Sequence, residues 1–444
     1  MQTNRLWLVV AIPLGLLCAL WLLSVPDGTL TGDFWSWRKA LIYLTGVLAM
    51  GSMSLGVMLA ARPVQIESAL GGLDKFYRLH KWFGVTGLTL ALTHWLLEVG
   101  PRWLGQLGWL TRPARPPQTA VVATGFDPFR DLKDIATELG ELSLYLLIVL
   151  VLLALWKRFP YRAFLTTHRL MAPIYLVLVF HAVILVDRTY WSAPLGPVLA
   201  LLMAGGGFAA VVALFRRIGN ARKAVGRIES ILRYDDNAVL DVGVRLETAW
   251  TGHRAGQFAF VDFGGTEGAH PFTVSSAWQR DGRLLFSIKG LGDYTRKLPD
   301  QLFVGQSVTI EGPYGRFDFE GDRARQVWVG GGVGITPFIA RLAALAADSR
   351  ENEVDLIYCT GAPSGIFIDK ISALAAQAGV GFHLLVSPRD GKLTLDRLEA
   401  WIPAWKDADV WFCGPSGFGD AIRTSMIHRG LSASQFHQEL FEMR

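Results

Sequence analysis

The sequence predicts a multi-domain protein with three parts: a bundle of six transmembrane helices, an antiparallel β-barrel, and an α/β layer built on a parallel sheet. A hydrophobic fraction of 51% and a mean hydropathy of +0.32 are too high for a wholly soluble protein. Nearly all long apolar runs precede residue 216. Later residues form short alternating runs, followed by apolar strands that alternate with helical stretches. We therefore expect domains at residues 1–217, 218–322 and 323–444.

Six segments are long and apolar enough to cross about 30 Å of hydrocarbon. They are residues 6–25, 40–61, 79–98, 139–156, 168–187 and 194–215. The first is long for the core of a signal peptide and lacks a small-residue cleavage site, so we expect a retained helix. Six spans place both chain ends on one side. The connectors 62–78 and 157–167 on that side are rich in Arg and Lys, which predicts that it is cytoplasmic.

The net charge of +5 and the pI near 9.1 raise the question of a nucleic-acid partner. The densest basic cluster directly follows the last apolar run and consists of Arg216, Arg217, Arg222, Lys223 and Arg227. This placement favours a cytoplasmic membrane flank, because no basic patch alternates with aromatic residues in a recognition module. We expect the lipid bilayer as a partner, no nucleic acid, and no protein partner that the sequence identifies.

Four histidines fall in or at the end of apolar spans, where ionisable residues are functional candidates. His80 and His94 lie in the third span, 14 residues apart, and His168 and His181 lie in the fifth, 13 residues apart. These gaps correspond to about 21 Å and about 20 Å along a helix. His80 can therefore face His168 near the cytoplasm, and His94 can face His181 nearer the outside, so that each pair binds one b-type haem. The chain has no Cys-x-x-Cys-His motif, so such a haem must be held non-covalently.

The directions in which the histidines point around the helix axis match less simply than their depths. At 100° per residue, a gap of 14 returns close to the starting face of a helix, whereas a gap of 13 misses it by about 140°. A straight fifth helix does not satisfy the second pair, although Pro173 between His168 and His181 can kink it. The alternative is that the four histidines only form hydrogen bonds between helices.

Two motifs lie in the predicted barrel. The first is His270-Pro271-Phe272-Thr273-Val274-Ser275, and the second is Lys289-Gly290-Leu291-Gly292-Asp293-Tyr294-Thr295. Together with the four histidines, they resemble the NADPH oxidase and ferric reductase superfamily, whose cytoplasmic half is similar to ferredoxin-NADP reductase. The resemblance covers about residues 40–444.

This resemblance implies FAD as a cofactor bound by both motifs. It implies that His270 and Phe272 contact FAD and that Thr273 forms a hydrogen bond near the redox-active nitrogen of the flavin. The residues that it places near the FAD pyrophosphate are Lys289, Gly292 and Thr295. Pro271, Ser275 and Tyr294 belong to the same two motifs and are expected at the FAD site. An aromatic ring is suited to cover one face of the flavin ring system, and a hydroxyl group is suited to stabilise its reduced form.

A glycine-rich segment follows the apolar strand at 327–329 and precedes a helical pattern, which predicts a nucleotide-binding turn. Its expected NAD(P)-binding residues are Gly330, Gly331, Gly332, Gly334, Thr336 and Pro337. Cys413-Gly414-Pro415 ends the last buried strand and resembles the nicotinamide-site motif of the superfamily, with Cys413 close to the departing hydride. Phe441 resembles the C-terminal aromatic residue that stacks on FAD until nicotinamide displaces it.

The donor is expected to be NADPH or NADH. The loop at 360–365 contains no basic residue for a 2′-phosphate, and Arg389 is the candidate from a later loop. A second glycine run, at 205–207, lies inside an apolar span and indicates close helix packing instead of a nucleotide turn.

The resemblance implies an integral membrane protein of the bacterial inner membrane, with its FAD and NAD(P) domains in the cytoplasm. Electrons would pass from NAD(P)H through FAD and two b-type haems to O2, giving superoxide, or to a ferric chelate. Glu98 departs from the histidine that eukaryotic NADPH oxidases often carry near the oxygen site. A rival hypothesis is a haem-free flavin reductase with a membrane anchor. The sequence shows no recognisable quinone site.

Overall fold

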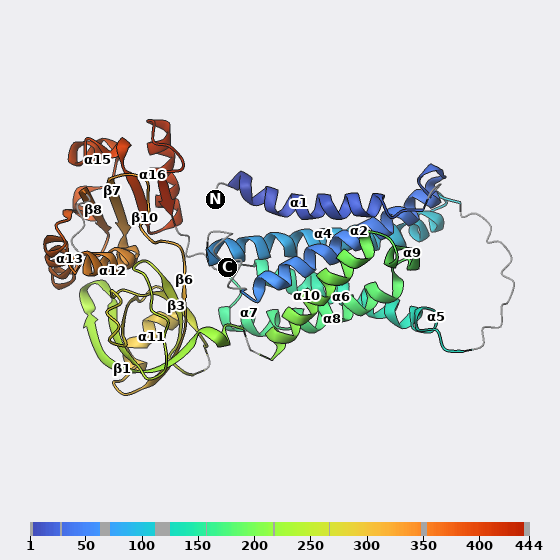
Figure 1. Ribbon diagram of the computed structural model, residues 1–444, viewed down its shortest axis with the longest axis horizontal. Helices are drawn as coiled ribbons and strands as arrows, with labels where there is room; N and C mark the ends of the chain where they lie inside the picture. Colours follow the sequence, from blue (N-terminus) through green and yellow to red (C-terminus); the bar gives the residue numbers. More distant parts are fainter. Residues whose placement is uncertain are drawn as a thin grey trace. The chain divides into compact units, whose positions relative to one another are not determined.

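Apolar helices form the first part of the chain in the computed structural model (Figure 1). The structure describes residues 3–26, 29–62, 72–111, 125–156, 158–215, 218–265, 267–347 and 353–438. The chain divides into two units, one made mainly of residues 1–218 and the other mainly of residues 219–443.

The longer helices of the first unit are α1 (Thr3–Leu22), α2 (Phe34–Ala60), α4 (Leu73–Gln106), α6 (Lys133–Leu155), α7 (Tyr161–His168), α8 (Met171–Leu185) and α10 (Leu195–Leu214). Two helices of four residues join them on one side, α5 (Pro128–Asp131) and α9 (Arg188–Trp191). Four stretches of the described residues are long and apolar enough to cross a membrane: Phe34–Ala60, Lys133–Leu155, Tyr161–Leu185 and Leu195–Leu214. The remaining two predicted spans lie on α1, whose apolar part is Trp7–Leu22, and on α4, which carries charged residues toward both ends.

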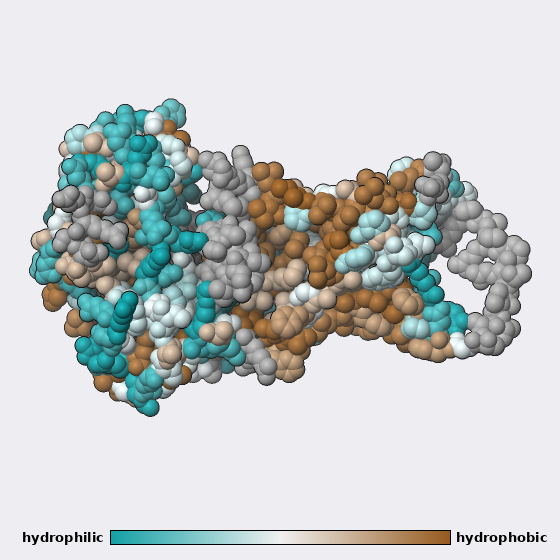
Figure 2. Space-filling view, in the orientation of Figure 1, coloured by the Kyte–Doolittle hydropathy of each residue, from teal (hydrophilic) through white to brown (hydrophobic). Residues whose placement is uncertain are grey.

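The outer surface of this unit is apolar, as the brown surface in Figure 2 shows. Leu152 on α6 and Leu201 and Phe208 on α10 expose more than half of their side-chain area. In water such a surface would be costly, but in hydrocarbon it costs nothing. The first unit is therefore a membrane-spanning domain, and the chain is an integral membrane protein.

Glycines allow the helices of the membrane unit to approach closely, as the run at 205–207 indicated. A methyl group at Gly206 would lie 2.2 Å from the hydroxyl oxygen of Tyr175, and one at Gly205 would lie 2.8 Å from Sδ of Met58. The Tyr175 hydroxyl in turn forms a 2.7 Å hydrogen bond with Ser54. At these positions α10 contributes no side chain, so those of Tyr175 on α8 and Met58 on α2 pack directly against its backbone.

The fifth predicted span is not a single helix. α7 ends at His168 and α8 begins at Met171, so the helix breaks at Arg169 and Leu170. Pro173 lies in the first turn of α8, where its missing N–H has no intrahelical acceptor to lose. The break resets the direction of the side chains, which removes the angular conflict of a 13-residue gap.

The second unit begins with a six-stranded antiparallel sheet in the order β4-β3-β6-β1-β2-β5. The strands are β1 (Lys223–Tyr234), β2 (Val239–Leu246), β3 (Phe258–Asp262), β4 (His270–Thr273), β5 (Arg283–Lys289) and β6 (Ser307–Tyr314), and α11 (Asp293–Gln301) follows β5. Alternating burial along β1 places Ala224, Gly226 and Ile228 inside and Val225 and Arg227 outside. The antiparallel sheet was predicted; its closure into a barrel stays a prediction.

A five-stranded parallel sheet follows, in the order β11-β10-β7-β8-β9. Its strands are β7 (Arg325–Gly331), β8 (Glu353–Thr360), β9 (Gly381–Val386), β10 (Asp409–Cys413) and β11 (Phe436–Gln438), and its main helices are α12 (Thr336–Leu345), α13 (Gly365–Gln377), α15 (Leu395–Trp401) and α16 (Ser416–His428). The chain runs outward from β7 through β8 to β9 and then returns to β10 on the other side. The strand order thus reverses between β7 and β10, where ligands of such sheets bind at the carboxyl ends of the strands.

The antiparallel and parallel sheets share a hydrophobic core. Tyr234 and Phe317 from the antiparallel part pack in one cluster with Phe338 and Trp411 from the parallel part. The ring of Phe317 meets that of Trp411 at 5.1 Å and that of Phe338 at 5.6 Å. This continuous core fixes the two lobes of the second unit against each other.

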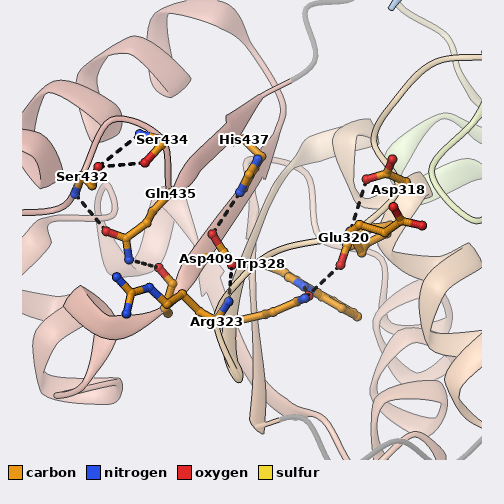
Figure 3. Close-up of polar contacts among 12 residues, drawn as sticks. Asp318, Glu320, Arg323, Trp328, Asp409, Ser432, Ser434, Gln435 and His437 are labelled. Carbon is orange, nitrogen blue, oxygen red and sulfur yellow. Dashed lines mark hydrogen bonds and ion pairs between the residues drawn. The ribbon is translucent and has the colours of Figure 1, made fainter. Parts of the chain in front are cut away.

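Polar contacts fasten the last strand at the amino end of the parallel sheet (Figure 3). The buried carboxylate of Asp409 accepts a hydrogen bond from the backbone N–H of Arg323 at 2.9 Å and lies 3.1 Å from Nε2 of His437. The His437 ring stacks on Trp411 with centroids 4.1 Å apart. This cluster lies at the start of β10, whereas Cys413 ends that strand. It therefore anchors β11 and does not belong to the nucleotide edge.

Candidate electron-transfer site

The four intramembrane histidines meet in the two predicted pairs. The rings of His80 on α4 and His168 at the end of α7 have centroids 5.7 Å apart. The rings of His94 on α4 and His181 on α8 have centroids 6.3 Å apart. Two imidazoles that bind one metal ion from opposite sides, each through a bond of about 2 Å, have centroids about 6 Å apart. The spacing of both pairs therefore fits a two-histidine iron site.

The hydrogen bonds of the histidines leave the other ring nitrogen available. Nδ1 of His80 lies 2.8 Å from the carbonyl oxygen of Gly56, Nδ1 of His94 lies 2.9 Å from that of Ile42, and Nδ1 of His181 lies 2.8 Å from that of Ala136. A carbonyl can only accept, so Nδ1 carries the proton and Nε2 keeps its lone pair. This is the usual second contact of a metal-bound histidine. The fourth ring, His168, has a buried Nδ1 without a hydrogen bond in the described structure and packs on Phe164 at 5.1 Å.

Each pair joins α4 to another helix, α7 for the inner pair and α8 for the outer pair. No cluster of three or more His, Cys, Asp or Glu residues suited to a metal ion occurs among the described residues. A haem would need only one histidine pair from the protein, because the porphyrin would supply the other four nitrogens.

Two glycines that the sequence analysis did not single out make room for the outer pair. A methyl group at Gly140 on α6 would lie 2.1 Å from Nδ1 of His181, and one at Gly46 on α2 would lie 3.2 Å from Nδ1 of His94. The sequence signal was only a glycine within an apolar span, alone at 140 and one of three in residues 40–61. Without a known neighbour, such a glycine is indistinguishable from one that serves helix packing.

An ion pair lies one turn beyond His94. The guanidinium of Arg38 donates to the carbonyl oxygens of Leu97 and Glu98 and, at 2.9 Å, to the carboxylate of Glu98. Arg102 approaches the same carboxylate at 3.7 Å. Glu98 and Arg38 thus form one group, while the ammonium of Lys39 lies over the ring of Tyr43.

The two flavin motifs come together in the antiparallel sheet. The ring of His270 stacks on that of Tyr294 with centroids 4.1 Å apart and an interplanar angle of 19°. Burial lowers the pKa of His270, an effect that the carboxylates of Glu267 and Asp262 partly offset. Burial, followed by the same two charges, raises the pKa of Tyr294 to about 12. Both rings are therefore uncharged near neutral pH and form a flat, partly buried platform.

The second motif forms a turn that opens a helix. The hydroxyl oxygen of Thr295 accepts hydrogen bonds at 3.0 Å from the backbone N–H groups of Leu291 and Gly292, and α11 begins at Asp293. A helix N-terminus favours a negatively charged group. Lys289 ends β5 and points toward the glycine turn of the parallel sheet, because its Nζ lies 4.0 Å from where a methyl group on Gly332 would be. Pro271 and Phe272 lie beside His270 on β4, and Thr273 ends that strand.

The nucleotide motifs also meet. Gly330 of β7 is paired in register with Cys413 of β10, and Gly331 packs against Gly414 and Pro415. Gly332 has a positive φ of 59°, which favours glycine. The predicted Thr336 and Pro337 open α12 directly after this turn. The carboxyl ends of the central strands therefore face the N-terminus of α12, the arrangement that binds a pyrophosphate.

Replacement of Gly334 by alanine is expected to abolish NADH binding while FAD is retained. Its methyl group would lie 2.2 Å from the carbonyl oxygen of Cys413, so the turn must move away from the strand end. Isothermal titration with NADH and the FAD content of the purified protein would check this. Alanine at Gln377, the exposed last residue of α13, is the control and should bind NADH normally. Normal NADH binding by the Gly334 variant would contradict the assignment of this turn.

Two predicted residues are placed less informatively. Arg389 lies in the short helix α14 (Ser387–Asp390) after β9 and forms a bidentate ion pair with the neighbouring Asp390, at 2.7 Å and 2.9 Å. This pairing holds the pKa of Asp390 at about 2. Phe441 lies outside the described residues.

Two known protein families match separate parts of the chain. Residues 45–179 match the ferric reductase-like transmembrane component, and residues 227–318 match an FAD-binding domain. The chain has the domain arrangement of the ferric reductase and NADPH oxidase superfamily. His80, His94 and His168 lie inside the first match, and His181 lies two residues beyond its end.

Curated relatives of this ferric reductase-like chain match less than half of it. A flavohemoprotein of Pseudomonas putida is 30% identical over 193 residues, which is 41% of this chain and 48% of that protein. The stachydrine N-demethylase reductase subunit Stc4 of Rhizobium meliloti is 28% identical over 205 residues, which is 43% of this chain and 58% of that protein. The chain thus spans about half the length of these relatives.

Among solved structures, the FAD/NAD-binding domain of a nitric oxide dioxygenase from Vibrio cholerae aligns with 49% of the chain and 98% of that domain, at 23% identity and a TM-score of 0.43. The flavohemoglobin of Malassezia yamatoensis aligns with 91% of the chain and 98% of that protein, at 17% identity and a TM-score of 0.48.

Proposed function

We propose that this ferric reductase-like chain carries electrons from NADH or NADPH through FAD and two b-type haems across the membrane to an acceptor at its outer face. The observation that carries the proposal is the meeting of His80 with His168 and of His94 with His181 within a membrane-spanning domain. Flavin and nucleotide motifs that converge in the same chain supply the entry point for the electrons. Hydrogen bonds between helices alone would not require two matched pairs at two depths.

Each group has a distinct role in this proposal. The glycine turn at 330–334 and Cys413-Gly414-Pro415 hold the nucleotide, with Cys413 beside the carbon that releases hydride. The His270–Tyr294 platform, Phe272, Thr273 and the turn at Lys289 and Thr295 hold FAD, which accepts two electrons and passes them on singly. The four histidines would hold two haem irons, which would supply one-electron transfer. Phe441 is proposed to cover the flavin until nicotinamide displaces it.

The proposal includes six spans, formed by α1, α2, α4, α6, α7 with α8, and α10. Residues 1–217 would form the di-haem domain, 218–322 an FAD-binding barrel and 323–444 the NAD(P) domain. The Arg and Lys residues of the connectors support a cytoplasmic location for the latter two domains. The membrane would then be the bacterial inner membrane.

Molecular oxygen is the proposed acceptor. One hydride supplies two electrons, which reduce two O2 molecules to superoxide, and one proton is released. Oxygen is small and uncharged, so its binding needs no charged site. The nearby carboxylate of Glu98 is already neutralised by Arg38. The second candidate is an anionic ferric chelate, which the two guanidinium groups of Arg38 and Arg102 around one carboxylate favour.

Anaerobic optical titration of the purified protein with NADH and with NADPH tests the proposal. We expect haem absorption bands that become reduced, followed by rapid reoxidation with superoxide formation when oxygen is admitted. Reoxidation only by a ferric chelate would identify a ferric reductase. Absence of haem from a protein whose flavin is reduced would instead support a membrane-anchored flavin reductase.

A further inference from the structure

A buried carboxylate lies where the nucleotide lobe meets the antiparallel sheet. Asp241 on β2 is 4% exposed and accepts three hydrogen bonds. Nζ of Lys370 donates at 2.6 Å, the hydroxyl of Ser287 at 2.6 Å and the hydroxyl of Tyr234 at 3.3 Å. Ser287 and Tyr234 belong to the same sheet as Asp241, whereas Lys370 comes from α13 of the parallel layer. Of the three donors, Lys370 is therefore the one that joins the parallel layer to the antiparallel sheet.

The hydrogen bonds continue from Asp241 to the flavin motif. Ser287 is paired with Asp241 in the register of β2 and β5, and its backbone N–H donates to the hydroxyl of Ser275 at 3.1 Å. The Ser275 hydroxyl donates to the carbonyl oxygen of Thr273 at 3.4 Å. The four residues that form this series of hydrogen bonds, Asp241, Ser287, Ser275 and Thr273, are all buried. A continuous polar path thus links α13 to Thr273 at the end of β4, the strand that begins with His270.

The energetics argue against stability as the main role of the pair. Burial of the Asp241 carboxylate is costly, and the Lys370 side chain stays 28% exposed, so the attraction between the two charges is partly screened by water. The shared aromatic core already holds the lobes together. The ion pair instead fixes the relative position of α13 and β2, because its short hydrogen bond forms in only one arrangement of the two elements. Burial, followed by the charge of Asp241, raises the pKa of Tyr234 to about 12, so this hydroxyl keeps the proton that it donates.

A second polar contact joins the two lobes near the first. The hydroxyl of Ser364, just before α13, lies 3.3 Å from the carboxylate of Asp236, just before β2. The antiparallel sheet therefore meets the region of α13 at two points, through Asp236 in the turn before β2 and through Asp241 on β2. The segment that follows β8 leaves the carboxyl edge of the parallel sheet, where the nucleotide site is.

We propose that Lys370 is a positioning residue for hydride transfer: through Asp241, Ser287 and Ser275 it fixes the nucleotide lobe relative to the flavin-binding strand end. This inference rests on the proposed function. Lys370 touches neither the glycine turn nor the flavin motifs, so it acts through Asp241. A displacement of about 1 Å between reacting groups is enough to cost about 100-fold in rate. Loss of the pair should therefore affect the rate of transfer more than the binding of nucleotide.

The test is stopped-flow reduction of the flavin by NADH, under anaerobic conditions, in the full-length holoprotein. In Lys370→Met we expect the limiting rate to fall at least about 10-fold, while the half-saturating NADH concentration and the FAD content stay as in the wild type. Lys370→Arg, which keeps the charge, should restore most of the rate. Lys392→Met, at an exposed lysine of the same lobe, is the matched control and should behave as the wild type.

A double variant, Asp241→Asn with Lys370→Met, separates positioning from folding because it leaves no unpaired buried charge. We expect it to be as stable to heat as the wild type and as slow in hydride transfer as Lys370→Met. A wild-type limiting rate in either variant would overturn the proposal. A raised half-saturating concentration at an unchanged limiting rate would also overturn it, since Lys370 would then bind the nucleotide. Failure of NADH to reduce the wild-type flavin would instead refute the proposed function.

Discussion

Replacement of His94 by leucine is expected to abolish electron delivery to the outer face and to leave the reduction of FAD by NADH intact. His94 is one of two rings whose centroids lie 6.3 Å apart, and leucine offers no lone pair to a metal ion. The inner-pair ligand His80 lies 14 residues before it on α4, about 21 Å along the helix. The purified variant should contain about one haem per chain instead of two, measured by the pyridine haemochrome spectrum, and should reduce its remaining haem with NADH. Superoxide formation in vesicles should fall to background.

Two controls define this experiment. Leucine at His428, an exposed histidine in the last turn of α16, should change neither haem content nor superoxide formation. Leucine at His80 should remove the inner haem and stop electron transfer earlier, so that no haem becomes reduced. If the His94 variant keeps two haems and delivers electrons normally, the outer pair is not an electron-transfer site.

The depth of the histidines could be predicted from the sequence, but their angular match could not. Depth depends only on the rise of a helix, so gaps of 14 and 13 residues on two spans already imply two levels. The angle depends on where a helix breaks. The break at Arg169 and Leu170 lies just before Pro173, which lacks the N–H that would bond to the carbonyl oxygen of Arg169, but a proline alone does not predict how far the following helix turns. Hydropathy treats α7 and α8 as one span.

The parallel layer shows why local motifs were more informative than the surroundings of the sites. A glycine-rich turn between a strand and a helix has one favoured geometry, so the sequence predicted the contact of the turn with the end of β10. The contact between Lys370 and Asp241 joins residues 129 positions apart. Nothing in either neighbourhood distinguishes this lysine from a solvated one, since only the packing of the two lobes brings it to the carboxylate.

Replacement of Gly140 by alanine is expected to destroy the outer haem site although no metal ligand is changed. The added methyl group would lie 2.1 Å from Nδ1 and 2.4 Å from Cε1 of His181, far closer than non-bonded atoms approach. The ring must turn, which breaks its 2.8 Å hydrogen bond to the carbonyl oxygen of Ala136. Loss of such a bond at a buried polar group costs about 1–3 kcal/mol, and loss of the supporting partner of a metal-bound histidine lowers metal affinity by about 10–100-fold.

A redox titration of the purified Gly140 variant followed optically would measure this effect. We expect one of the two haem transitions to be lost or shifted, while flavin reduction by NADH and the inner haem stay as in the wild type. Alanine at Gly15 in α1, which has no neighbour within 4 Å, is the matched control. It should leave both transitions unchanged and raise helix stability by up to about 1 kcal/mol. Two unaltered haem transitions in the Gly140 variant would mean that the His181 ring does not bind iron in the orientation that its hydrogen bond imposes. The result would therefore test the ligand geometry independently of the ligand itself.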